Sequence, residues 1–303
     1  MERYTSSDKE LYVFLMTPIE IKSALQSLGG PANNHLGQHF LIDRATLEVI
    51  VNEAHQHPGM RTLEIGPGLG VLTKELIRNG HNVVALERDR RFIGWLENVG
   101  AHGNAPSDPP AAGVLNVIPG DATTLDWDRY IGKDEWQLIS NLPYSISSFV
   151  LRTALYMPHL PEQIVVLVQR EVAERVLSVA GDTSGRSRGK TSLLSLMVAL
   201  AASRVEILRR VPPGCFFPPP KVDSAILRIV PRPHAERIET YGIDPEEVMT
   251  VAKKGFAHPR KLLASNLGLT PEQRGQCVEM GIPEKARAED VAPQQWVALT
   301  RLV

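Results

Sequence analysis

Short apolar runs alternate with longer stretches of mixed polarity through the first part of the chain. The apolar runs have the length of buried strands, and the stretches between them have room for one helix each. This alternation is typical of βα units, in which parallel strands form one sheet with helices on its faces. The apolar runs are residues 61–65, 82–87, 114–118, 136–140 and 164–168.

The pattern changes after the last of these units. Residues 205–211 and 225–230 are strand-like and are separated by a proline-rich connection, residues 212–221. We expect them to form an antiparallel pair that closes the sheet. The prediction is therefore a seven-stranded, doubly wound, Rossmann-like α/β fold. Two polar segments, residues 101–113 and 182–190, are predicted to be surface loops.

Helix starts are marked by capping residues. Thr17, Pro18 and Glu20 fit the N-cap, first and third positions of a helix that should end before Gly29. Asp43 is expected to cap the next helix. The sequence therefore predicts a helix ahead of the first βα unit, and residues 1–15 in front of it are interpreted as an N-terminal extension.

Helix starts dominate the end of the chain. Asp244 and Thr270 are each followed by proline and glutamate, as in capped helices with acidic first turns. We expect a domain boundary near residues 232–241. The predicted organisation is an extension at residues 1–15, an α/β domain at residues 16–235 and a helical domain at residues 236–303.

Composition narrows the class of protein. Of 303 residues, 43 % are hydrophobic and 22 % are charged, which is ordinary for a globular protein. Cys215 and Cys277 are too far apart for a metal-binding motif or a disulfide framework. The most apolar stretch, residues 193–202, is too short for a membrane span and is predicted to be a buried helix. We expect a cytoplasmic monomer without a metal.

Charge does not identify a partner. Lysine and arginine number 33, and aspartate and glutamate number 34. A polyanionic partner would therefore have to meet a local basic patch.

Three polar features follow consecutive predicted strands. Gly66 and Gly68 form a glycine-rich turn that lets a ligand approach the backbone. Glu87 ends the next strand and can accept hydrogen bonds from ribose hydroxyls, and Asp121 after the third strand can accept one from an adenine amine. Together they predict an adenosine-containing cofactor at the carboxyl edge of the sheet. NAD and S-adenosylmethionine both remain possible at this point.

The segment after the fourth strand indicates the chemistry. Asn141 and a backbone carbonyl of this loop can accept hydrogen bonds from an exocyclic amine, which turns the nitrogen lone pair toward an electrophile. Pro143 stiffens the loop, and Tyr144 offers a flat face for a base. Positioning then carries most of the catalysis, and no general base is required.

Four motifs resemble those of the bacterial small-subunit rRNA adenine N6,N6-dimethyltransferases. The proline-rich motif is the most specific and the glycine turn the least. The resemblance runs from about Thr17 to the C-terminus. The motifs are residues 36–41, the glycine turn, residues 141–147 and residues 211–224.

The resemblance implies a class I S-adenosylmethionine-dependent methyltransferase with a C-terminal rRNA-binding domain. Its implied substrate is two adjacent adenosines in the 3′-terminal hairpin loop of 16S rRNA within the immature small ribosomal subunit. By position, the cofactor contacts are His39, Leu41, Gly66, Gly68, Glu87, Asp121 and Asn141. The base site is Asn141, Leu142 through its carbonyl, Pro143 and Tyr144, with Phe216 closing over the base opposite Tyr144.

The sequence departs from the family pattern at three places. His39 stands where asparagine is usual, and residues 188–192 lack the usual aromatic residue. Residues 256–261 keep only the last two basic residues of a family motif. The candidate phosphate contacts are Arg186, Arg188, Lys190, Arg209, Arg210, Lys253, Lys254, Arg260 and Lys261.

Parts of the sequence also fit other functions. A related resistance-type methyltransferase of large-subunit rRNA is the nearest alternative, and the leucine in Asn-Leu-Pro-Tyr and the proline-rich motif favour the small-subunit group. A DNA adenine methyltransferase should carry a target-recognition domain, and an NAD enzyme should carry a hydride-acceptor site. The sequence indicates neither of these. The remaining alternative is an RNA-binding assembly factor with vestigial catalysis.

Overall fold

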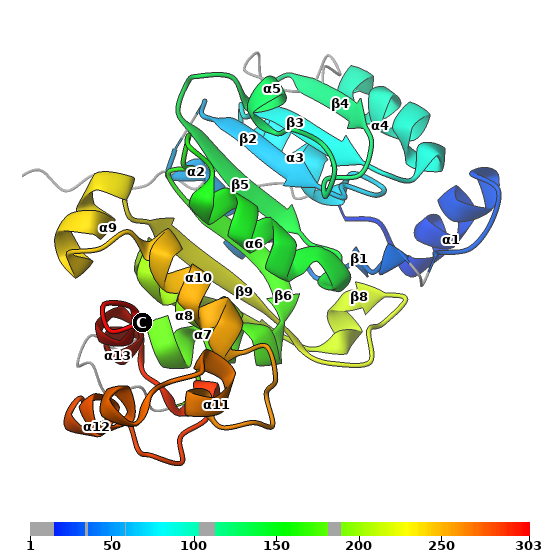
Figure 1. Cartoon of the computed structure of the whole chain (residues 1–303). Helices are drawn as coiled ribbons and strands as arrows, with labels where there is room; N and C mark the ends of the chain where they lie inside the picture. The colour runs from blue at the N-terminus through cyan, green and yellow to red at the C-terminus, as the bar shows by residue number, and fades with distance from the viewer. Residues whose placement is uncertain (1–14, 34–35, 58, 103–112, 181–188) are drawn as a thin grey trace, which may run out of the picture.

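A mixed sheet of seven strands forms the centre of the computed structural model, in the order β4-β3-β2-β5-β6-β9-β7 (Figure 1). The structure describes residues 15–33, 36–57, 59–102, 113–180 and 189–303. Five strands are parallel, and β9 runs antiparallel to both β6 and β7. The strands are β2 (Arg61–Ile65), β3 (Asn82–Glu87), β4 (Leu115–Pro119), β5 (Trp136–Asn141), β6 (Ile164–Gln169), β7 (Ala202–Val211) and β9 (Ser224–Pro231).

The continuous apolar strands are explained by burial on both faces of the sheet. In β6, Ile164, Val166 and Val168 enter one hydrophobic cluster. Val165 and Leu167 enter the other cluster. The first cluster contains helices α6 (Ser147–Tyr156), α7 (Arg170–Ala180) and α8 (Leu193–Ala201), with the short α5 (Asp128–Ile131) beside them. The second contains α1 (Pro18–Ser27), α2 (Arg44–His55), α3 (Val71–Arg78) and α4 (Arg90–His102).

The predicted caps are present. Thr17 and Glu20 form a capping box at α1, and the Asp43 carboxylate accepts from the Thr46 backbone at the start of α2. Asp244 and Thr270 cap the helices that follow them. These starts depend on a few adjacent residues, which is why the sequence alone located them.

The C-terminal helices pack on the side of α8 and extend the first hydrophobic cluster through Val248, Leu263, Cys277 and Trp296 (Figure 1). They are α9 (His234–Tyr241), α10 (Pro245–Gly255), α11 (Leu263–Leu267), α12 (Pro271–Glu279) and α13 (Pro293–Thr300). The sequence analysis did not predict α9, which occupies the expected boundary segment. The buried Arg237 of α9 donates to the Leu155 carbonyl of α6 at 2.8 Å.

A second, two-stranded sheet lies beside the main one. β1 (Phe40–Leu41) pairs antiparallel with β8 (Phe216–Phe217) of the proline-rich connection. Short 3-10 turns precede β8 at Pro213–Cys215 and follow β5 at Tyr144–Ile146, and a third lies at Ala288–Asp290. This small sheet was not predicted, and it brings the segment before β1 against the segment before β9.

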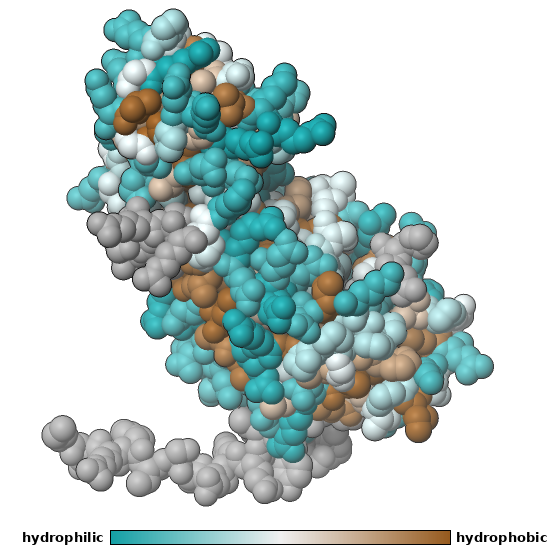
Figure 2. Space-filling view, turned by 90° about the horizontal axis from the view of Figure 1, so that it is seen from below, coloured by the Kyte–Doolittle hydropathy of each residue, from teal (hydrophilic) through white to brown (hydrophobic). Residues whose placement is uncertain are grey.

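Three predicted segments lie mostly outside the described residues. They are the N-terminal extension, the loop at residues 101–113 and the loop at residues 182–190. Of the helices that are described, none combines the length and the hydrophobicity of a membrane span. The face turned toward the viewer in Figure 2 is largely hydrophilic, with separate hydrophobic patches between the polar side chains.

Candidate functional site

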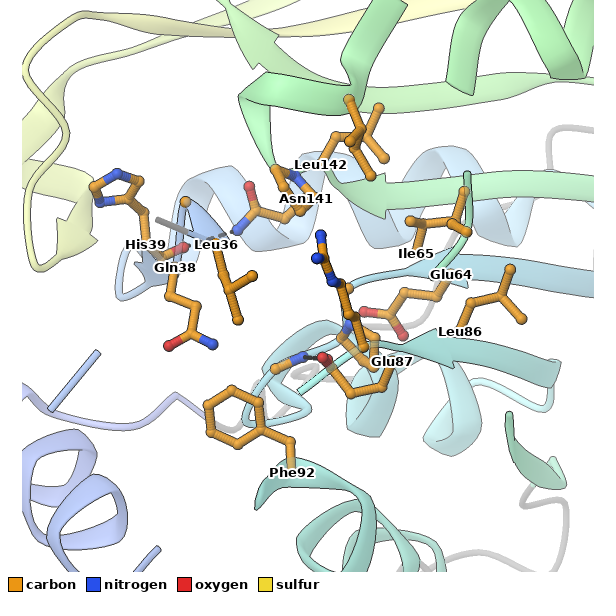
Figure 3. A pocket seen from close by; sticks show the side chains of 18 of the residues that line it. Leu36, Gln38, His39, Glu64, Ile65, Leu86, Glu87, Phe92, Asn141 and Leu142 are labelled. Atoms are coloured by element: carbon orange, nitrogen blue, oxygen red, sulfur yellow. Dashed lines mark hydrogen bonds between the residues drawn. The ribbon is translucent and has the colours of Figure 1, made fainter. Parts of the chain in front are cut away.

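A pocket opens at the carboxyl ends of β2, β3 and β5, where the sequence analysis expected a ligand. Figure 3 shows His39, Glu87 and Asn141 around this cavity, and each comes from a different part of the chain. The predicted residues that line it are His39, Leu41, Gly66, Gly68, Glu87, Asp121, Asn141, Leu142, Pro143 and Tyr144. The fold therefore brings ten of the predicted site residues together at one pocket.

The glycine turn forms the floor of the pocket. Gly66 and Gly68 have φ values of 69° and 57°, a region in which residues with a Cβ are strained. A Cβ on Gly66 would lie 3.3 Å from the Pro143 ring, and one on Gly68 would lie 3.0 Å from Phe40. The absent Cβ atoms thus let Pro143 and Phe40 pack closely on the turn, whose backbone lines the pocket at the start of α3.

Glu87 holds the turn from the end of β3. Its Oε2 accepts from the Gly68 backbone N–H at 3.0 Å, and its Oε1 accepts from the Asp89 backbone N–H at 2.7 Å. The side chain is buried, and burial raises the pKa of this carboxyl. A carboxylate has about four acceptor positions, so Glu87 can still accept a hydrogen bond from a ligand while it fixes the turn.

Asp121 lies at the far end of the same edge. Its Oδ1 accepts from the Thr123 N–H at 2.9 Å and the Thr123 hydroxyl at 2.7 Å, and these bonds lower the pKa of the Asp121 carboxyl. Its Oδ2 lies 3.2 Å from the Arg88 guanidinium, which also lines the pocket. No role was predicted for Arg88, although this cation directly follows Glu87, a predicted ligand-binding acid.

Asn141 forms the corner after β5. Its Nδ2 donates to the His39 carbonyl at 3.0 Å. Because a carbonyl can only accept, the amide must present its NH₂ group there, and Oδ1 remains the acceptor for a ligand. The corner is stiffened by Pro143, whose carbonyl accepts from the Ile146 N–H at 3.1 Å.

Tyr144 and His39 present rings to the same part of the pocket. The ring centroids are 6.0 Å apart with an interplanar angle of 25°. The Tyr144 hydroxyl lies 2.5 Å from the Ser224 hydroxyl, and His39 Nδ1 lies 2.7 Å from the Pro218 carbonyl oxygen. Both rings are therefore fixed by the chain that leads into β9.

Gln38 also lines the pocket, although no role was predicted for it. Its Nε2 donates to Asp89 Oδ2 at 2.8 Å, and its Oε1 accepts from the Asn33 N–H at 2.7 Å. These bonds hold the segment before β1 over the turn that follows β3. Gln38 could have been suspected as a site residue because it lies within the motif of residues 36–41.

Phe216 does not reach the pocket. It is 2 % exposed, belongs to the second hydrophobic cluster and pairs in register with Leu41. The expectation that Phe216 closes over a base is therefore not met in this arrangement, because the side chain points into the core beneath the small sheet.

The candidate phosphate contacts fall into three groups. Arg186 and Arg188 lie outside the described residues. Three side chains are already paired with acids, Lys190 with Glu289, Arg209 with Asp43 at 3.7 Å and Arg210 with Glu174 at 3.0 Å. Four are exposed at the end of α10 and in the segment before α11, namely Lys253, Lys254, Arg260 and Lys261. Among the described residues, no group of three or more metal-ligating side chains comes together.

Comparisons with known proteins agree with this geometry. Residues 30–303 match the sequence model of the family described as Ribosomal RNA adenine dimethylase. A Ribosomal RNA small subunit methyltransferase A from Synechocystis is 35 % identical, with 88 % of this chain and 94 % of that protein covered. A protein of the same name from Dehalococcoides mccartyi is 33 % identical, with 92 % and 91 % covered.

Two solved structures share the architecture. The 23S rRNA methyltransferase ErmE is 26 % identical with a TM-score of 0.60, covering 87 % of this chain and 98 % of that chain. A dimethyladenosine transferase from Plasmodium falciparum has a TM-score of 0.62 at 22 % identity, covering 86 % and 96 %. At 22 % identity, the likeness to the Plasmodium falciparum structure supports the fold alone.

A buried acid at the pocket generates a prediction about pH. Glu64 is 2 % exposed, accepts from the Thr73 hydroxyl at 2.7 Å and has its pKa raised by burial to about 8. The folded chain thus keeps a proton that the unfolded chain releases near 4.5. Raising the pH from 5 to 8 should favour unfolding, and Glu64→Gln should gain stability over the native chain by roughly 2–4 kcal/mol across that range.

Urea denaturation at several pH values between 5 and 8.5 measures this difference. The exposed Glu97 supplies the control, since Glu97→Gln makes the same chemical change at the surface of α4 instead of the interior. Parallel stability curves for Glu64→Gln and the native chain would show that Glu64 is ionised in the folded state.

Proposed function

The chain belongs to the ribosomal RNA adenine dimethylase family, and we propose that it transfers methyl groups from S-adenosylmethionine to N6 of adenine in small-subunit rRNA. The observation that carries the proposal is the single pocket in which an adenosine-type cradle adjoins the Asn141 corner. The names of the curated relatives support the small subunit as the source of the substrate RNA.

The cradle fits this cofactor residue by residue. The backbone of the glycine turn lines the pocket at Gly66 and Gly68 and offers its N–H groups to a ligand at the start of α3. Glu87 has acceptor capacity for the two ribose hydroxyls, and Asp121 has it for the adenine amine. When bound, S-adenosylmethionine supplies a methyl group on a positively charged sulfur.

The Asn141 corner positions the target amine. Asn141 Oδ1 and the Leu142 carbonyl accept the two N–H groups of the adenine N6, which turns the nitrogen lone pair out of the ring plane and toward the methyl group. Tyr144 stacks on the base and holds it at this position. The alkylated nitrogen is cationic and loses its proton without a side-chain base.

The target adenine has to leave its stack before its amine can reach this corner. A loop of structured RNA meets that requirement most easily. The proposed substrate is two adjacent adenosines in the 3′-terminal hairpin loop of 16S rRNA, within the immature small subunit. The exposed basic side chains of α10 and the following segment support residues 236–303 as the part that contacts phosphates.

Large-subunit rRNA is the second candidate substrate, because ErmE shares 26 % identity and the same fold. The family match across residues 30–303 and the names of the curated relatives favour the small subunit. Methyl incorporation into separated small and large subunits, each isolated without these modifications, decides between the two. Incorporation into the large subunit alone would overturn the proposal.

Replacing the corner amide should abolish most of the turnover. Asn141→Ala removes one of the two acceptors that orient the amine, and we expect the rate of methyl transfer to fall on the order of 100-fold. The measurement is incorporation of labelled methyl groups into unmethylated small subunits at saturating cofactor. A variant that binds the subunit normally and methylates at the native rate would instead favour a binding factor without catalysis.

Cofactor binding and base stacking should separate in two variants. Glu87→Ala should weaken S-adenosylhomocysteine binding by about tenfold or more, because a charged acceptor of ribose hydroxyls is lost. Tyr144→Ala should slow turnover by a similar factor and leave that affinity unchanged, because the ring holds the base.

Calorimetry gives the affinities and methyl incorporation gives the rates. Glu97→Ala and Tyr144→Phe are the matched controls, since one removes an exposed acid of α4 and the other keeps the ring. An unchanged affinity in Glu87→Ala would remove Glu87 from the cofactor site. Equal losses of affinity and turnover in Tyr144→Ala would place its ring against the donor.

A further inference from the structure

A second hollow in the surface adjoins the pocket and is lined by arginines. Arg88, Arg90 and Arg91 line it where the chain passes from β3 into α4, and Leu36 lies among the residues on its other side. Arg88 and Leu36 also line the pocket itself. The two cavities therefore share a border at these two side chains. We call the second cavity the arginine hollow.

Arg88 marks the place where the pocket opens to solvent. It lines the pocket, yet its side chain is 64 % exposed. Arg90, two residues further along the chain, is also exposed. A side chain that both lines a pocket and faces solvent lies at the mouth of that pocket. A large substrate that sends one group into the pocket can therefore reach both guanidinium groups from outside.

Arg91 forms a fixed wall of the hollow. It contacts the Asp89 carboxylate at 2.7 Å, and it donates to the Pro31 carbonyl at 3.3 Å and the Gly30 carbonyl at 3.4 Å. These bonds join the start of α4 to the chain that leads from α1 to β1 (Figure 1). The charge of Arg91 is thus compensated by Asp89, and its role in the hollow is structural.

The other two arginines keep donors for a ligand. Arg88 lies 3.2 Å from one oxygen of Asp121, which engages only part of a guanidinium with five N–H donors. Arg90 has no acidic partner within the part of the chain that the structure describes. Since Asp89 is the one acid among the residues that line the hollow, its net charge is positive. The fitting ligand is therefore an anion.

We propose that the arginine hollow binds a backbone phosphate of the RNA strand whose adenine enters the pocket. The inference rests on the proposed function and adds to it a phosphate site beside the reacting base. A planar guanidinium can donate two parallel hydrogen bonds to two phosphate oxygens, so Arg88 and Arg90 suit this group better than a lone surface lysine.

The position of the hollow favours RNA over a small anion. The exposed basic residues predicted as phosphate contacts lie at the end of α10 and before α11, and none of them lines the pocket. An adenine that leaves its stack brings its own stretch of backbone to the mouth of the pocket. Contacts to phosphates fix the register of a nucleic acid without reading its sequence. The arginine hollow supplies such a contact at the mouth itself.

The test compares charge removal at the hollow with the same change elsewhere. The variants are Arg90→Gln, Arg90→Lys and the double variant Arg88→Gln/Arg90→Gln. Arg129→Gln is the matched control, because Arg129 is exposed on α5. That helix lies at the opposite end of the strands, where Arg61 at the start of β2 donates to the Ile131 carbonyl at 2.6 Å.

Binding of the full-length protein to unmethylated small subunits is measured over a series of salt concentrations. Arg90→Gln should lower the affinity about fivefold at low salt and reduce the slope of log affinity against log salt by about 1. The double variant should lose more, whereas Arg90→Lys keeps the charge and should keep the slope. Arg129→Gln should match the native chain.

Calorimetry with S-adenosylhomocysteine on the same preparations separates the RNA from the cofactor. Arg90→Gln should bind this ligand within about twofold of the native affinity, because Arg90 does not line the pocket. Retained binding also shows that the variant is folded.

Three results would overturn the inference. The first is native affinity and slope for the subunit in both Arg90→Gln and the double variant. The second is an equal loss in Arg129→Gln, which would reduce the effect to net charge. The third is weaker S-adenosylhomocysteine binding by Arg90→Gln with native affinity for the subunit. Failure of the native protein to bind or methylate the subunit is a separate result, because it refutes the proposed function itself.

Discussion

The hydrogen bond from the Asn141 amide to the His39 carbonyl joins two parts of the chain that are 102 positions apart. It orients the amide, so that Oδ1 is the acceptor left for a ligand. It also holds the segment before β1 across the pocket, where Gln38 and the β1–β8 pairing fix it from either side. The cover of the pocket and the orientation of its reactive corner thus depend on the same contact.

The sequence predicted those parts that depend on neighbours along the chain. The limits of β2 and β3, the glycine turn and the caps at Thr17 and Asp43 agree with the structure, since each is set by a few adjacent residues. Most of the pocket residues were expected because they follow parallel strands that end at one edge, whereas His39 and Leu41 were expected only from the resemblance to the family. The β1–β8 sheet, α9 and the burial of Phe216 were missed, because they depend on which distant surfaces pack together.

Buried acids lie at the pocket, whereas exposed basic side chains lie on the outer surface. At the pocket, burial raises the pKa of both Glu64 and Glu87, and the neighbouring Glu87 charge raises that of Glu64 further. A ligand with a positively charged centre would compensate that cost. On the outer surface, Lys190, Arg209 and Arg210 are paired with acids, so a phosphate has to compete with internal carboxylates there. The exposed basic charge of the described candidates lies at the end of α10 and in the segment before α11.

The antiparallel pairing of Phe40–Leu41 with Phe216–Phe217 matters for the order in which the molecule is completed during translation. The glycine turn, Glu87 and Asn141 are all synthesised well before the proline-rich segment. A nascent chain can therefore build the floor of the pocket while its cover still lacks a partner strand. Only when β8 and β9 have left the exit tunnel can both ring anchors form, so the rings of His39 and Tyr144 are fixed later than the floor of the pocket.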